Sequence, residues 1–223
     1  MNPGRDLFVD QGGPPYIRKS DIAMAENTLK PYQEKRDFKK TSEPQGKKGR
    51  NKRIFVIQKH DATTLHYDFR LSMGGVLKSW AVPKGLSTRA GEKHLAIRTE
   101  DHPMDYADFE GLIPEDEYGG GTVMVWDMGE VEPIAPGEDH EQSMAEGLKN
   151  GAFKFNLKGR KLQGGYALVR MDKKAKQEQW LIFKLADEHA DARRNPVRTE
   201  PDSVLTGRSM KDIAKEENQV SGS

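Results

Sequence analysis

The residues best suited to chemistry in this chain are gathered between positions 60 and 70, in the segment HDATTLHYDFR. His66, Asp68 and Arg70 alternate with apolar residues at positions 67, 69 and 71, which is typical of a strand with one polar and one apolar face. Imidazole and carboxylate side chains bind divalent metals, and a guanidinium group binds phosphate as a planar fork. This segment is therefore a candidate metal and phosphate site.

A neighbouring strand is expected to complete the metal site. Residues 54–57 read IFVI and predict a strand that ends near His60, with a turn joining it to the next strand. In that register His60 lies opposite His66. Gln58 then lies opposite Asp68, and such cross-strand neighbours are about 5 Å apart. Two imidazoles and a carboxylate at this spacing suit Zn, Mn, Fe or Ni, and the absence of cysteine leaves no thiolate to select zinc.

The wider grouping of histidines favours a site over the ordinary explanation, in which polar side chains on an open sheet face are simply solvated. His94 and His102 fall on another expected strand, so four of the six histidines lie between positions 60 and 102. Arg98 and Glu100 lie on the same stretch. Clusters of titratable groups of this kind are typical of functional sites.

The elements that must position these residues are mostly strands. From position 54 onward, short apolar or alternating segments are separated by glycine-rich turns. The fold expected is mainly β, a compact antiparallel β-barrel of about eight strands with a few short helices and flexible termini. The glycines at 119–121 lead into a strand and not a helix, so they predict a turn and not a phosphate cradle. The expected strands lie at 54–57, 66–71, 76–82, 93–99, 122–126, 153–157, 166–170 and 179–184, and a short helix at 140–149.

The composition divides the chain into one domain with two tails. Only 35% of the 223 residues are hydrophobic and 32% are charged. We expect a flexible extension over residues 1–30, a barrel domain over 31–186 and a polar, disordered tail over 187–223. The net charge is +1, but residues 45–53 carry five basic side chains and no acid, which would help to hold a nucleic-acid backbone.

The location expected is cytoplasmic, with no membrane association. The chain has no cysteine, which excludes disulfides and a thiolate nucleophile. No apolar run approaches the ~20 residues of a membrane span, and the N-terminus lacks the apolar core of a signal peptide.

Several longer motifs resemble those of the 3′-phosphoesterase module of bacterial DNA ligase D, which also occurs as stand-alone proteins. The motifs are FVIQKHDATTLHYDFRL at 55–71, SWAVPKG at 79–85, TEDHPMDY at 99–106, FEGLIP at 109–114, YG at 118–119, and upstream RDF at 36–38 with T at 41 and EP at 43–44. The resemblance runs from about residue 32 to residue 185. Since 223 residues leave no room for a polymerase or ligase domain, a stand-alone module is expected.

The resemblance implies a compact β-barrel with a polar crevice and a hydrolase that uses Mn²⁺ or another divalent transition metal. The implied activities are a phosphodiesterase that removes a 3′-terminal ribonucleotide and a phosphomonoesterase that removes a 3′-phosphate. The implied substrates are DNA or RNA–DNA 3′ ends, which would be left with a 3′-hydroxyl for ligation in repair by non-homologous end joining. A DNA ligase and Ku are the implied partners.

The matching motifs also imply roles for individual residues. The metal ligands fall on His60, His66 and Asp68. The other implied catalytic residues are Arg70, which contacts phosphate, His102 and Tyr106. With an ordinary pKa near 6.5, His102 would add a second donor or protonate the leaving oxygen, and Tyr106 would donate a hydrogen bond to phosphate.

Further matching positions surround these six. Lys84 would contact the nucleic-acid backbone. His94 stands where some ligase D modules carry arginine, so it would contact phosphate only when protonated or as a single donor. Glu100 would orient Arg70 or a ligand histidine, or else form a surface ion pair with Arg98. The remaining polar positions are Gln58 and, on a segment that must fold across the crevice, Arg36 as a substrate contact with Asp37 and Glu43.

Two other functions compete with this one. A non-catalytic nucleic-acid-binding barrel would need stacking aromatics exposed on its sheet, whereas Tyr67 and Phe69 are predicted on the core face. A metal-free ribonuclease would use two histidines as acid and base, and would not need Asp68 between His66 and Arg70. Measuring turnover with and without a chelator distinguishes the three functions. The binding barrel would show no turnover in either condition, and the metal-free ribonuclease would be unaffected by the chelator.

Overall fold

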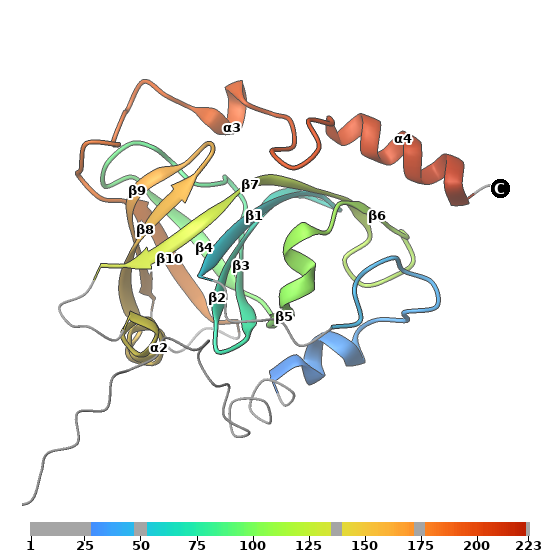
Figure 1. Ribbon diagram of the computed structural model, residues 1–223, viewed down its shortest axis with the longest axis horizontal. Helices are drawn as coiled ribbons and strands as arrows, with labels where there is room; N and C mark the ends of the chain where they lie inside the picture. Colours follow the sequence, from blue (N-terminus) through green and yellow to red (C-terminus); the bar gives the residue numbers. More distant parts are fainter. Residues whose placement is uncertain (1–27, 47–52, 135–139, 172–176, 222–223) are drawn as a thin grey trace, which may run out of the picture.

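The computed structural model describes residues 28–46, 53–134, 140–171 and 177–221, and the strands among them form a closed antiparallel barrel. Neighbouring strands follow the order β1-β2-β3-β4-β10-β9-β8-β7, and β7 pairs with β1 to close the ring (Figure 1). The barrel strands are β1 Ile54–Asp61, β2 Leu65–Met73, β3 Val76–Val82, β4 Lys93–Arg98, β7 Gly121–Pro133, β8 Ala152–Gly159, β9 Gln163–Arg170 and β10 Gln179–Lys184. Closure matters because it leaves these eight strands without an unpaired edge.

The predicted fold class is confirmed. Each of the eight barrel strands contains most of one segment expected from the sequence, and the expected helix is α2 (His140–Asn150). Two short strands were not expected, namely β5 (His102–Pro103), which pairs with β3, and β6 (Gly111–Ile113), which pairs with β7. None of the helices in the described ranges has the length and apolar character needed to cross a membrane.

The barrel interior is filled by large apolar side chains that alternate along the strands. On β2, Tyr67 and Phe69 are 3% and 0% exposed, so they belong to the core as predicted. They pack with Trp80, Trp126 and Trp180, each of them fully buried. Because side chains alternate along a strand, this packing turns the polar residues of β2 to the outer wall of the barrel.

A second, smaller core covers part of that outer wall. It lies under the 3₁₀ helix η1 (Met104–Asp108) and the helical residues 28–34. Val56 of β1 and Leu77 of β3 are fully buried in it, together with Tyr32 from the N-terminal segment. The polar side chains beside this core are therefore largely buried instead of facing open solvent.

The C-terminal segment differs from the disordered tail expected over 187–223. It contains α3 (Pro196–Thr199) and α4 (Met210–Ser221), which lie along one side of the barrel (Figure 1). Ile213 is 0% exposed, and the Trp126 indole N–H donates to the Glu200 carbonyl at 2.8 Å. Low hydrophobicity was misleading here because a few buried residues (Pro196, Ser203 and Ile213) and backbone carbonyls bound by barrel side chains hold the segment. Of the flexible extension expected over 1–30, all but residues 28–30 lies outside the described residues, and those three are helical.

Candidate metal and phosphate site

The hairpin of β1 and β2 brings the three expected metal ligands together. Its register is the predicted one, with His60 opposite His66 and Gln58 opposite Asp68. The ligand atoms of His60, His66 and Asp68 all lie within 4.8 Å of one another. His60 Nδ1 and His66 Nε2 are each 3.6 Å from one of the two Asp68 carboxylate oxygens. Each histidine thus directs one ring nitrogen to the same carboxylate.

Backbone carbonyls set the proton positions of both imidazoles. His60 Nε2 lies 2.8 Å from the Gly119 carbonyl, and His66 Nδ1 lies 2.8 Å from the Thr64 carbonyl. A carbonyl only accepts, so these nitrogens carry the protons, and in the neutral rings the nitrogens facing Asp68 hold lone pairs. Two neutral imidazole lone pairs and a carboxylate fit a divalent transition metal.

The loop that supplies the Gly119 carbonyl is the predicted glycine turn. Gly119 has φ +78°, and the chain passes directly into β7 two residues later. The positive φ favours glycine there, and the turn orients a metal ligand through its backbone.

Arg70 is held in place beside the triad by three hydrogen bonds. Its Nε donates to Gln58 Oε1 at 2.7 Å, Nη2 donates to Asp68 Oδ2 at 3.0 Å, and Nη1 lies 2.9 Å from His102 Nδ1. Gln58 is itself anchored by bonds from Nε2 to the carbonyls of Tyr106 and Phe109. The guanidinium, in a residue only 2% exposed, therefore has one defined orientation.

Asp68 is ionised in this setting. Burial by itself raises the pKa of the carboxyl, but neighbouring groups, the Arg70 guanidinium foremost, lower it by more, and the net pKa lies well below the usual range. A charged carboxylate is the form that binds a metal cation.

His102 lies between two guanidinium groups. Its Nδ1 faces Arg70, and its Nε2 is 3.4 Å from Arg36 Nη2. Burial, followed by the charges of Arg70 and Arg36, holds the pKa of His102 well below 6.5. The ordinary pKa assumed from the sequence is wrong for this histidine, which is neutral near neutral pH.

The N-terminal segment crosses the site as expected and carries two of the predicted residues into it. Arg36 Nε donates to Glu43 Oε1 at 2.9 Å, and both side chains are at most 5% exposed. The Tyr106 hydroxyl also donates to Glu43 Oε1, at 2.9 Å. Since Tyr106 is 2% exposed and its single hydroxyl proton points at Glu43, the structure gives it a positioning contact and not an open donor.

Glu100 belongs to the same network. Its carboxylate accepts from Lys35 at 3.1 Å and from Arg36 at 3.3 Å. The alternative partner considered from the sequence, Arg98, pairs instead with Asp101. Glu100 therefore holds Arg36 in place and contacts neither Arg70 nor a metal ligand among the hydrogen bonds and ion pairs of the described residues.

Three predicted residues are not brought into this network. His94 pairs with buried Ile182 and shares its face of β4 with the core residue Ala96, so it lies on the opposite face of the barrel wall from Asp68; its Nδ1–H donates to a carbonyl at 2.6 Å. Asp37 is exposed and accepts from a backbone N–H two residues along, as a turn former does. Lys84 is exposed just beyond the end of β3, near the start of β2 and therefore near His66.

The sequence analysis missed several residues that support the site. They are Tyr32, whose ring packs under the Arg36 guanidinium at 3.8 Å; Ser79, whose hydroxyl is 3.3 Å from His102 Nδ1; Lys35; and Tyr118 with Gly119. Ser79 carried a usable signal, because it lies opposite Arg70 in the pairing of β2 with β3, and Tyr118 with Gly119 stood in a matching motif to which no role was assigned. The others depend on contacts between distant segments.

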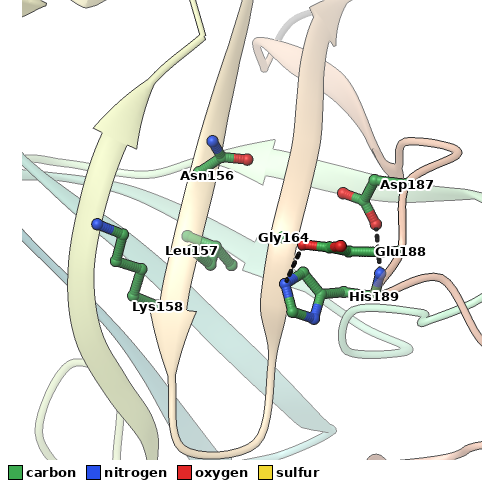
Figure 2. A pocket seen from close by; sticks show the side chains of 7 residues that line it. All are labelled: Asn156, Leu157, Lys158, Gly164, Asp187, Glu188 and His189. Carbon is green, nitrogen blue, oxygen red and sulfur yellow. Dashed lines mark hydrogen bonds and ion pairs between the residues drawn. The ribbon is translucent and has the colours of Figure 1, made fainter.

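A separate pocket lies elsewhere on the barrel and includes none of the predicted site residues (Figure 2). Its lining residues are Asn156, Leu157, Lys158, Gly164, Asp187, Glu188 and His189. The Asp187 carboxylate is already engaged by Lys184 and by the backbone N–H groups of Gly165 and His189. These bonds hold the segment after β10 against the barrel. The polar groups that line the pocket therefore have a structural role, and we assign no ligand to it.

Comparison with known proteins identifies the family of the chain. Residues 58–170 match the model of the DNA ligase D 3′-phosphoesterase domain. The multifunctional non-homologous end joining protein LigD of Pseudomonas aeruginosa is 45% identical over 188 residues, which are 82% of this chain and 22% of that protein. The corresponding DNA repair protein of Mycobacterium tuberculosis is 40% identical over 173 residues, covering 76% of this chain and 21% of the relative. The chain thus spans about a fifth of the length of these relatives, and it belongs to the DNA ligase D 3′-phosphoesterase domain family.

Proposed function

We propose that this chain is a divalent-metal-dependent phosphoesterase that heals DNA 3′ ends. It would remove a 3′-terminal ribonucleotide as a phosphodiesterase and a 3′-phosphate as a phosphomonoesterase, leaving a 3′-hydroxyl. The observation that carries the proposal is the convergence of two imidazole lone pairs and the Asp68 carboxylate beside Arg70. Family membership supports the reaction class.

The metal ligands of the proposed site are His60, His66 and Asp68. A divalent ion such as Mn²⁺, when held there, supplies Lewis-acid polarisation of a phosphoryl group. The carbonyls of Gly119 and Thr64 keep the two imidazoles in the ligand tautomer.

Arg70 is the proposed phosphate clamp. A guanidinium has five N–H groups, and three of them face Gln58, Asp68 and His102. Among the described residues this leaves one N–H on each terminal nitrogen for phosphate oxygens. Because the orientation exists before substrate binds, the charge that develops on phosphate meets donors that need no rearrangement.

Neutral His102 positions Arg70 in this proposal. In the free protein its low pKa keeps the ring neutral near neutral pH. A neutral imidazole has a single acceptor nitrogen, and the contact with Arg70 at 2.9 Å is shorter than the contact with Arg36 at 3.4 Å, so loss of His102 would free the Arg70 guanidinium. Lys84, exposed near the start of β2, would contact the nucleic-acid backbone.

The proposed setting is the repair of DNA breaks by non-homologous end joining, the process named in the relatives' descriptions. A DNA ligase and Ku are the expected partners. A non-catalytic DNA-binding barrel receives less support, because the aromatic residues of β2 that could have stacked on bases are in the core.

The test uses DNA oligomers that end in a 3′-phosphate or in a single 3′-ribonucleotide. Phosphate or nucleoside release is measured with the metal present, after EDTA, and after Mn²⁺ is restored. The variant is His66→Ala, and the matched control is His189→Ala, an exposed histidine remote from the triad. We expect release that stops with EDTA, returns with Mn²⁺, and is lost in His66→Ala alone. Release that ignores EDTA, or none in any condition, would refute the proposal.

A further inference from the structure

Tyr118 is an aromatic side chain that the proposed mechanism does not use. It is 49% exposed, and it is the one aromatic residue among the large hydrophobic side chains that the described part of the chain leaves exposed. Single exposed hydrophobic side chains are common on protein surfaces, so the exposure of Tyr118 does not by itself assign it a role. The position of Tyr118 relative to the proposed metal and phosphate site therefore has to be considered.

The backbone of Tyr118 is tied to the metal site. The next residue, Gly119, accepts the hydrogen bond that sets the tautomer of His60. Tyr118 is therefore one backbone residue from a group that orients a proposed metal ligand.

The ring of Tyr118 is tied to the other end of the site. Lys35 Nζ donates to its hydroxyl at 3.2 Å and lies 4.5 Å from the ring centroid, while the Arg36 guanidinium lies 5.6 Å from the centroid. Lys35 is in turn bonded to Glu100, which also holds Arg36. These contacts keep the ring in one position while about half of its surface stays open, and they place two cations beside it, each of them paired with a carboxylate.

We propose that Tyr118 is a stacking platform for the nucleobase of the nucleotide that carries the scissile 3′-phosphate. A fixed aromatic surface flanked by cations is the arrangement that binds single-stranded nucleic acid, because the ring stacks on a base while the cations attract the backbone. The nucleotide that bears the phosphate is the one that both proposed substrates share, so its base is the one that we assign to the ring. This inference rests on the proposed function and assigns a specificity residue to it.

The test compares oligomers that differ only in one base. One ends in an ordinary nucleotide with a 3′-phosphate, the second has an abasic nucleotide at that position, and the third has the abasic nucleotide several positions upstream. KM and kcat for phosphate release are measured for the wild type, Tyr118→Leu and Tyr118→Phe. Tyr118→Phe keeps the ring and removes the hydroxyl that binds Lys35, so it separates stacking from a merely structural contact.

We expect Tyr118→Leu to raise KM roughly tenfold for the ordinary end, the size of one base–aromatic stack, and to leave kcat little changed. Its KM for the terminal abasic oligomer should equal that of the wild type. Tyr118→Phe keeps the ring and loses only one of the contacts that fix it, so it should raise KM far less than Tyr118→Leu does. The inference is overturned if Tyr118→Leu affects both ends equally, or if Tyr118→Phe loses as much as Tyr118→Leu.

Equilibrium binding keeps this inference separate from the proposed function. Fluorescence anisotropy of the same oligomers is measured with His66→Ala and with the double variant that adds Tyr118→Leu, so no turnover is needed. A base-dependent loss of affinity in the double variant supports stacking even if the wild type releases no phosphate, a result that would sink the phosphoesterase proposal alone. Equal affinities would sink the stacking proposal alone.

Discussion

Replacing Gln58 by methionine tests whether the orientation of Arg70 depends on the buried Gln58 amide, which links Arg70 to the backbone of η1 and the residue after it. Gln58 is 0% exposed, and its amide makes three hydrogen bonds, two donated to backbone carbonyls and one accepted from Arg70. Methionine has a similar volume but forms none of these bonds, so the change removes polar contacts without opening a large cavity.

The size of the effect follows from the groups left unpaired. The Tyr106 carbonyl keeps a second partner, the backbone N–H of Phe109 at 3.2 Å, but the Phe109 carbonyl and Arg70 Nε lose the bonds that Gln58 made. Leaving a buried carbonyl and one charged donor unpaired costs about 3 kcal/mol. For a chain of 223 residues this lowers Tm by about 6–12 °C.

The assay is urea and thermal unfolding followed by circular dichroism, with Gln163→Met as the matched control. Gln163 is exposed and makes one longer bond, to the Gly159 carbonyl at 3.3 Å, so its replacement should change stability by less than about 0.5 kcal/mol. If Gln58→Met were as stable as the control variant, the Gln58 hydrogen bonds would not hold Arg70 in place, and the proposal that Arg70 is preorganised to bind phosphate would be wrong.

Three further predictions concern the metal, the pH dependence and the C-terminal segment. His66→Ala should weaken Mn²⁺ binding in calorimetry by more than about 100-fold, beyond what residues that merely support a ligand contribute, and an unchanged heat of binding would contradict the ligand assignment. Because burial, then Arg70 and Arg36, keep the pKa of His102 well below 6.5, the unfolded chain binds a proton that the folded chain does not when the pH falls below 6.5. The metal-free protein should therefore lose stability on acidification through that pH, and His102→Gln should flatten the slope; an equal slope would refute the assigned pKa. Ile213→Ala should cost about 2–4 kcal/mol in urea unfolding, whereas Leu205→Ala, at a residue 44% exposed, should cost little; equal costs would mean that α4 does not dock.

The metal triad could be predicted from the sequence because its members are close together along the chain. His60, His66 and Asp68 lie on one hairpin, and the alternation of polar and apolar residues sets which side chains share a face. A register shift of one residue would turn Phe69 out of the core, so the hydrophobic pattern and the ligand geometry have the same cause. The eight strands of the barrel were predictable on similar grounds.

The rest of the site was decided by tertiary structure. Glu43 and Arg36 reach Tyr106 and His102 only because the N-terminal segment packs on the second core, and the low pKa of His102 comes from burial, followed by the charges of two arginines distant in sequence. His94 seemed part of the cluster from its position in the chain, but closure of the barrel turned its face of β4 away from Asp68.

The C-terminal segment gives the same lesson for the fold. Its composition is that of a disordered tail, yet Ile213 is fully buried and Trp126 and Lys161 of the barrel bind the Glu200 carbonyl. Local patterns determine which residues share a strand face, because alternation and turn chemistry act over a few residues. The docking of the C-terminal segment, the pKa of His102 and the hydrogen-bond partners of the site residues depend on contacts with residues distant in sequence. Only the folded barrel determines those contacts.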